Sequence, residues 1–130
     1  MNSVKKLTIL VVDDDPKVRE LIQNYFTMRG EDINCVMAAD TQQAVMKLSN
    51  QEFDLVLIDN VMPGKLGIDF AVTLKRSIKY GKLPIVLMSG ALQQDDVLKA
   101  IDAGIRDILV KPFSLKQLNE KIQRVMKKFS

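Results

Sequence analysis

Five short apolar runs alternate along the chain with five segments in which apolar residues recur at helical spacing. The runs predict β-strands over Leu7–Val12, Asn34–Ala38, Asp54–Ile58, Pro84–Met88 and Ile108–Val110. The first, third and fourth runs are almost wholly apolar, which is typical of strands buried on both faces of a parallel sheet.

Residues that begin and end helices flank the segments between these runs. Asp15 and Pro16 predict an N-cap and the first residue of a helix that Gly30 ends. Two residue pairs have the spacing of a capping box, Asp40/Gln43 and Ser114/Gln117. Two further helices are predicted over 67–80 and 94–103, with Gly81 and Gly104 as their C-terminal caps. The last helix carries an apolar stripe at Leu115, Leu118, Ile122, Val125 and Phe129.

Strict alternation of strand and helix indicates an α/β fold, with a parallel sheet, right-handed crossovers and helices on both faces. The 130 residues suit one domain, and no linker or low-complexity stretch divides them. We therefore expect one domain over residues 1–130.

Composition excludes several classes of function. The chain has no His and a single cysteine, Cys35. Catalysis by a Ser-His-Asp or Cys-His set, a His-ligated zinc and an intramolecular disulfide are therefore excluded. No apolar run approaches the roughly 20 residues that span a bilayer. The N-terminal apolar run continues into three aspartates without a cleavage site, so we expect a core strand and a cytoplasmic protein.

Polar residues follow four of the five predicted strands. The carboxyl ends of parallel strands share one edge of the sheet, where ligands of open α/β folds bind. The residues at these ends are Asp13, Asp14, Asp15, Asp59, Ser89 and Lys111. Two carboxylates 4 Å apart repel by roughly 4 kcal/mol at an effective dielectric of about 20, so they need a counter-charge. A lysine and a magnesium ion would supply it, because all the candidate ligands are oxygen atoms.

Each of these residues also has a purely structural interpretation. Asp15 is best explained as an N-cap, because Pro16 follows it. Asp13 and Asp14 could help to cap the same helix, and Asp59 could begin a turn. Ser89 and Lys111 could be a loop hydroxyl and a solvated amine. These interpretations would all have to hold at once, which favours a shared site.

Four segments together resemble the receiver domain of two-component response regulators. They are LTILVVDDDP, LVLIDNVMPGKLG, LPIVLMSGA and ILVKPF, in this order and with fitting spacings over essentially the whole chain. The resemblance implies a flavodoxin-like three-layer sandwich with five helices and strand order 2-1-3-4-5.

The resemblance also implies a role for each site residue. Asp59 would accept a phosphoryl group as a carboxylate nucleophile. Asp14, Asp59 and the backbone carbonyl of Val61 would bind Mg²⁺ directly, and Asp13 would reach the ion through water. Lys111 and the Ser89 hydroxyl would bind phosphoryl oxygens, and the Lys111–Pro112 peptide bond would be cis.

The implied partners are proteins. A sensor histidine kinase or a histidine phosphotransfer protein would donate the phosphoryl group from a phosphohistidine, and a downstream protein would read the resulting conformational change. The family's usual output face would include Lys99, Arg106 and Lys116 here. We expect no direct binding to nucleic acid or membrane. The chain would be a signalling domain that assists its own phosphorylation and dephosphorylation, not an enzyme in the ordinary sense.

The sequence departs from the family pattern at three places. Ile108 stands where many members have an aromatic residue that swings on activation. Val61 and Ala91 flank the predicted pocket where others have polar side chains, and we hypothesise that the phosphoryl group is long-lived because no water is oriented there. Ser89 replaces the commoner Thr and should keep its hydrogen bond.

Two alternatives stay open at this point. One is a receiver fold that works as a non-catalytic scaffold, for which Ile108 is the main support. The other is a haloacid-dehalogenase-like phosphatase using Asp13 and Asp15. Pro16 opposes the phosphatase, Asp95 and Asp96 precede Lys111 where that family needs acids after the lysine, and Asp59 would have no role. An FMN carrier is disfavoured by the acidic loop after the first strand, and a Walker-type NTPase by the missing GxxxxGK[ST] motif.

Overall fold

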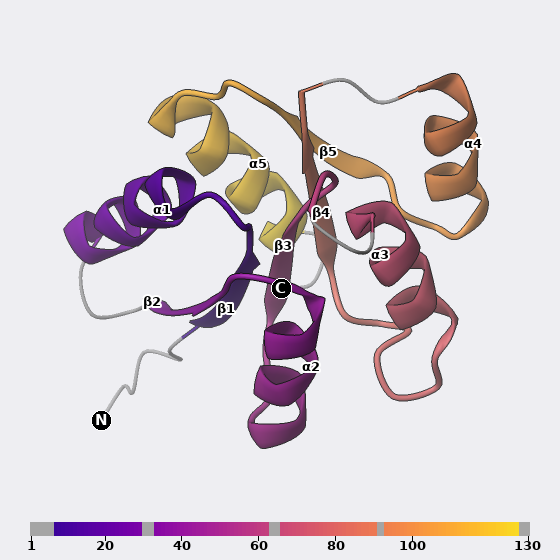
Figure 1. Cartoon of the computed structure of the whole chain (residues 1–130). Helices are drawn as coiled ribbons and strands as arrows, with labels where there is room; N and C mark the ends of the chain where they lie inside the picture. Colours follow the sequence, from indigo (N-terminus) through magenta and orange to yellow (C-terminus); the bar gives the residue numbers. More distant parts are fainter. Residues whose placement is uncertain (1–6, 30–32, 63–65, 91–92, 128–130) are drawn as a thin grey trace.

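The structure is a computed structural model that describes residues 7–29, 33–62, 66–90 and 93–127. The strands are β1 (Leu7–Val12), β2 (Ile33–Ala38), β3 (Leu55–Asp59), β4 (Ile85–Ser89) and β5 (Asp107–Val110). The helices are α1 (Pro16–Arg29), α2 (Thr41–Asn50), α3 (Gly67–Arg76), α4 (Gln94–Asp102) and α5 (Leu115–Lys127). Strand and helix alternate throughout, as the hydrophobic pattern predicts (Figure 1).

The strands form one parallel sheet in the order β2-β1-β3-β4-β5, which confirms the expected topology. Val12, the last residue of β1, pairs with Ala38 of β2 and Ile58 of β3. Asp59 at the end of β3 pairs with Met88 of β4, and Ser89 pairs with Val110 of β5. The register therefore brings the carboxyl ends of β1, β3, β4 and β5 to the same edge.

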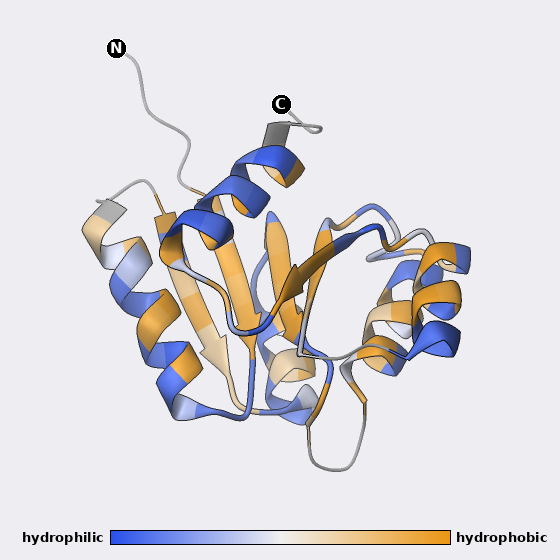
Figure 2. Cartoon of the chain, turned by 90° about the horizontal axis from the view of Figure 1, so that it is seen from above, coloured by the Kyte–Doolittle hydropathy of each residue, from blue (hydrophilic) through white to orange (hydrophobic). Residues whose placement is uncertain are grey.

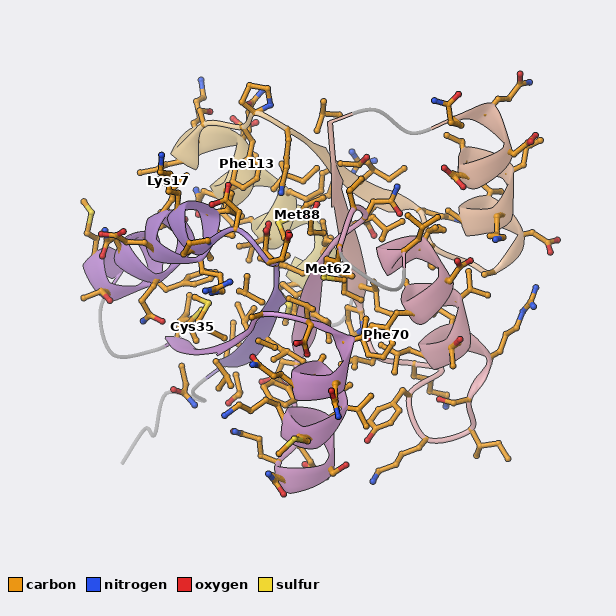
Figure 3. All side chains as sticks on the ribbon, in the orientation of Figure 1. Lys17, Cys35, Met62, Phe70, Met88 and Phe113 are labelled. Carbon is orange, nitrogen blue, oxygen red and sulfur yellow. The ribbon has the colours of Figure 1, made fainter. Side chains whose placement is uncertain are left out.

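Two hydrophobic layers cover the two faces of the sheet. Leu10 and Val12 of β1 face the layer covered by α2, α3 and α4, whereas Ile9 and Val11 face the layer covered by α1 and α5. Figure 1 shows α1 and α5 together on one side of the sheet, and the strands are mostly coloured as hydrophobic in Figure 2. Phe70 of α3 and Met88 of β4, labelled in Figure 3, belong to opposite layers.

Side chains cap three helices at the positions that the sequence indicates. The Lys17 N–H donates to Asp15 Oδ1 at 2.9 Å, which makes Asp15 the N-cap of α1. Ser114 and Gln117 form a reciprocal capping box at α5. At α2 only half of the predicted box is right: Asp40 accepts from the Gln43 N–H, but the Gln43 side chain accepts from Ala39 instead.

The largest difference from the sequence prediction is the end of α3, which comes at Arg76 and not at Tyr80. The Ser77 hydroxyl donates to Leu74 O and accepts from the Tyr80 N–H, so it satisfies backbone groups outside a helix. Gly81 is therefore wrong as a C-terminal cap. Gly104 is confirmed, because it follows the C-cap Ala103 with φ 87°.

The other strand and helix ends lie within a residue of their predicted positions, and Gly30 and Phe129 lie outside the described residues. In the described part of the chain, no helix combines the length and apolar character needed to cross a membrane.

Candidate functional site

Three carboxylates meet at the carboxyl edge of the sheet. Asp13 and Asp14 follow β1, and Asp59 ends β3. Each can offer an oxygen so that all three oxygens lie within 4.8 Å of one another. Asp13 is fully buried, Asp59 is 5% exposed and Asp14 is exposed, so the cluster opens to solvent on the side of Asp14.

Lys111 supplies a positive charge to this cluster. Its Nζ lies 2.8 Å from Asp13 Oδ2 and 3.1 Å from Asp59 Oδ1, and its side chain is 22% exposed. The Lys111–Pro112 peptide bond is cis, as the resemblance implies. One ammonium between two carboxylates leaves the three acidic groups with excess negative charge, which favours binding of a cation.

The environment alters the acid–base properties of Asp59 and Lys111. Burial, and after it the charge of Asp13, raises the pKa of Asp59 above its ordinary value, although Lys111 and a backbone hydrogen bond from Val61 partly oppose this. Burial lowers the pKa of Lys111, but its bonds to Asp13 and Asp59 outweigh burial, so the net pKa is raised. The lysine is therefore held as a cation, while ionised Asp59 needs more positive charge nearby.

Ser89 ends the neighbouring strand β4 and is 3% exposed. Its Oγ is the buried side-chain polar atom that finds no hydrogen-bond partner among the described residues. Burying an unpaired hydroxyl costs free energy, so a ligand oxygen at this edge would satisfy it.

Asn60, a residue that the sequence prediction missed, connects the end of β3 to the start of α3. Asn60 O accepts from the Gly67 N–H at 2.7 Å, and Asn60 Oδ1 accepts from the Ile68 N–H at 3.0 Å. Asn60 thus connects the start of α3 to the end of β3. An asparagine after a strand is a common turn residue, so nothing in the sequence alone distinguishes this brace from an ordinary turn.

Asp15 is the N-cap of α1, as the sequence indicates, so its carboxylate is not available as the second acid of a dehalogenase-like site. Asp13, Asp14, Asp59 and Lys111 form a single cluster, and Ser89 lies at the same sheet edge.

The donor atoms fit a hard divalent cation. Asp13, Asp14 and Asp59 offer oxygen, the ligand atom that Mg²⁺, Ca²⁺ and Mn²⁺ prefer. The acidic cluster can therefore hold a metal ion.

Residues 9–123 match the response regulator receiver domain, and the chain belongs to this family. Such domains interact with sensor kinases and downstream targets, and they are signalling domains, not classical enzymes.

Two curated relatives illustrate the range of the family. The chain is 30% identical over 122 residues to the chemotaxis protein CheY of Pseudomonas aeruginosa, with 94% of this chain and 98% of CheY covered. It is 33% identical over 121 residues to the phosphate regulon transcriptional regulatory protein PhoB of the same species. That match covers 93% of this chain but 52% of PhoB, so the chain spans about half the length of this relative.

Solved structures agree with the fold. CheY4 of Vibrio cholerae superposes with a TM-score of 0.84 at 26% identity, covering 92% of this chain and 98% of CheY4. A CheY-like receiver domain of Methanospirillum hungatei has a TM-score of 0.87 at 21% identity, with 95% of this chain and 96% of that domain covered. At this identity the match supports the fold alone.

Proposed function

We propose that Asp59 is the phosphoryl acceptor of this receiver domain. The observation that carries the proposal is the position of the Lys111 ammonium, which contacts the carboxylates of both Asp13 and Asp59. Phosphoryl transfer depends mainly on positioning and on neutralisation of charge, and an amine beside the acceptor provides both.

Mg²⁺ is the metal that we propose for the acidic cluster. Asp14, Asp59 and the carbonyl oxygen of Val61 would hold it directly, and Asp13 through water. When bound, the ion neutralises the charge that otherwise opposes the approach of a phosphoryl group to Asp59.

The proposed reaction breaks one bond and forms one. A carboxylate oxygen of Asp59 attacks phosphorus, the N–P bond of a partner's phosphohistidine breaks, and the imidazole nitrogen keeps the electron pair. Lys111 and the orphan hydroxyl of Ser89 then bind two oxygens of the new aspartyl phosphate. The Ser89 bond would bias the loop after β4 toward a second conformation.

The proposed donor is a sensor histidine kinase or a histidine phosphotransfer protein, and the proposed recipient of the signal is a protein target. Lys99, Arg106 and Lys116, all exposed, contribute to the proposed output face. We propose that residues 1–130 act as one receiver domain. The cytoplasmic location expected from the sequence stays a prediction.

The test is phosphorylation by acetyl phosphate in Mg²⁺, with intact mass as the readout. Wild type should gain one phosphoryl group, Asp59→Asn none, and the control Asp95→Asn, changed at an exposed residue of α4, should react like wild type. Chelation of the metal should abolish labelling of wild type and of Asp95→Asn. Wild type that accepts neither a phosphoryl group nor beryllofluoride would overturn the proposal and favour a non-catalytic scaffold.

A further inference from the structure

Arg19 reaches from the first turns of α1 back to the loop that carries the acidic cluster. Its Nη1 donates to the backbone carbonyl oxygen of Asp13 at 2.6 Å, and its own N–H donates to Asp15 O at 3.1 Å. The side chain is only partly exposed. The Arg19 side chain therefore hydrogen-bonds to the loop after β1 and does not extend freely into solvent.

Asp13 is held at every polar atom. Its N–H donates to Ala38 O at 3.0 Å, Oδ1 accepts from the Asp15 N–H at 2.9 Å and Oδ2 from Lys111 at 2.8 Å. The bond from Arg19 to the carbonyl oxygen completes the set. The buried carboxylate of Asp13 thus has several anchors and does not depend on Arg19 alone.

Asp14 has no comparable support from its own side chain. It is exposed, and within the described ranges its carboxylate makes no hydrogen bond or ion pair. The carbonyl of Asp13 and the N–H of Asp14 belong to the same planar peptide group, so fixing one fixes the other. The Asp13 carbonyl is the atom that Arg19 holds.

We infer that Arg19 is a positioning residue that holds Asp14 in place for the metal ion by fixing the Asp13–Asp14 peptide group. The inference rests on the proposed function, because it assigns Asp14 as a metal ligand. Groups that position a ligand without touching the metal commonly control affinity, since a ligand on a mobile backbone must be ordered when the ion binds.

Simple electrostatics predicts the opposite effect, which makes the inference testable. Arg19 is a permanent cation near an acidic cluster, so its charge alone opposes the binding of Mg²⁺. Removing it would tighten binding if charge were its only contribution. If it acts by positioning, removing it weakens binding.

The experiment compares Arg19→Met with Lys17→Met, which removes the same charge from the same end of α1. Lys17 is exposed and lies on the outside of the helix (Figure 3). Calorimetric titration should give an Mg²⁺ dissociation constant about tenfold higher for Arg19→Met than for wild type. Lys17→Met should bind as tightly as wild type or slightly more tightly. Arg19→Lys, which keeps a donor and the charge, should recover most of the affinity.

A second readout uses metal-free protein. In Arg19→Met the backbone amide resonance of Asp14 should shift and its hydrogen exchange should accelerate, whereas in Lys17→Met both should match wild type. Melting curves in chelator establish that each variant is folded at the titration temperature.

The failure of this inference is distinguishable from failure of the proposed function. Arg19→Met that binds Mg²⁺ as tightly as Lys17→Met, with an unchanged Asp14 amide, overturns the role of Arg19 and leaves the acceptor site intact. Wild type that binds no Mg²⁺ overturns the proposed metal site, and with it the inference.

Discussion

Gly67 lies so close to Asp59 that no larger residue fits. A Cβ built on Gly67 would be 1.9 Å from the carbonyl oxygen of Asp59 and 2.8 Å from its carbonyl carbon. These are backbone atoms of the strand that ends in the proposed acceptor, so they cannot move without moving the site. The first turn of α3 is thus packed directly against the backbone of the proposed acceptor.

Gly67→Ala should therefore disrupt the site and the fold together. We expect a loss of about 3 kcal/mol or more in the free energy of unfolding, because relief of the clash needs backbone displacement. Urea denaturation measures it. Gly90→Ala is the matched control, since its Cβ would lie 3.8 Å from Lys111 O and should cost less than about 1 kcal/mol. Equal stability of the two variants would contradict the packing argument.

Lys111→Met should separate the stabilising role of the amine from its competition with the metal. Without the ammonium, buried Asp13 and Asp59 lose their counter-charge, and metal-free protein should lose roughly 2 kcal/mol of stability. Mg²⁺ should bind more tightly than in wild type, since it no longer competes with the amine, and should restore part of the stability. Unfolding with and without Mg²⁺ measures both effects.

The control for Lys111→Met is Lys116→Met, which removes an exposed charge on α5. It should change neither the free energy of unfolding nor the affinity for Mg²⁺. Weaker Mg²⁺ binding by Lys111→Met would show that the amine supports the metal site instead of competing with it.

Asp59→Asn should stabilise the metal-free protein, in a pH-dependent way. Burial, and after it the charge of Asp13, raises the pKa of Asp59 above the ordinary 3.8, so the folded protein holds this proton more tightly than the unfolded chain does. Binding of this proton therefore stabilises the folded wild type at pH values below the ordinary pKa. This stabilisation is lost as the pH rises through the raised pKa of the folded protein. The advantage of Asn should thus be small near pH 3 and reach about 1 kcal/mol at neutral pH.

Denaturant unfolding in chelator at a series of pH values measures this difference. Saturating Mg²⁺ should make the wild type the more stable of the two proteins, because only the wild type keeps the Asp59 ligand. A stability gap that is constant from pH 3 to 7 would be incompatible with a raised pKa at Asp59.

The sequence predicts the sheet well because each buried strand is marked by its own short apolar run, and such runs recur along the chain. Strands β1, β3 and β4 are buried on both faces over most of their length, so their residues are almost all apolar. Parallel pairing then places Asp13, Asp59 and Lys111 at one edge. This is sufficient to predict the acidic cluster before any coordinates are known.

The supports of the site depend on contacts that no local pattern encodes. In the sequence, Arg19 looks like any arginine on the surface of a helix. Its hydrogen bond to Asp13 depends on the direction in which α1 leaves the loop. Gly67 stands at the start of a helix, but the need for glycine comes from the approach of α3 to Asp59. The early end of α3 likewise depends on the Ser77 hydroxyl.

Cys35 should be inert toward thiol reagents in the folded protein. The residue lies on β2 and packs against the hydrophobic layer beneath α1 (Figure 3). Burial raises the pKa of its thiol from 9.0 to about 12. Since the thiolate is the reactive form, labelling at pH 8 should be roughly a thousandfold slower in native protein than in urea. Native and denatured rates that agree within about tenfold would contradict burial of the thiol.

The lifetime of the aspartyl phosphate should depend on the polarity of residue 61. Val61 lies two residues after Asp59 and is 65% exposed, and its methyl groups offer no hydrogen bond to an attacking water. Val61→Asn should shorten the lifetime by about fivefold or more, because an amide can hold such a water in place. Val61→Ala, the apolar control, should leave it unchanged. Decay of the phosphorylated protein in Mg²⁺ measures both variants, and wild-type decay within seconds that Val61→Asn does not accelerate would contradict the hypothesis. Ala91, the other apolar residue in that hypothesis, lies outside the described residues.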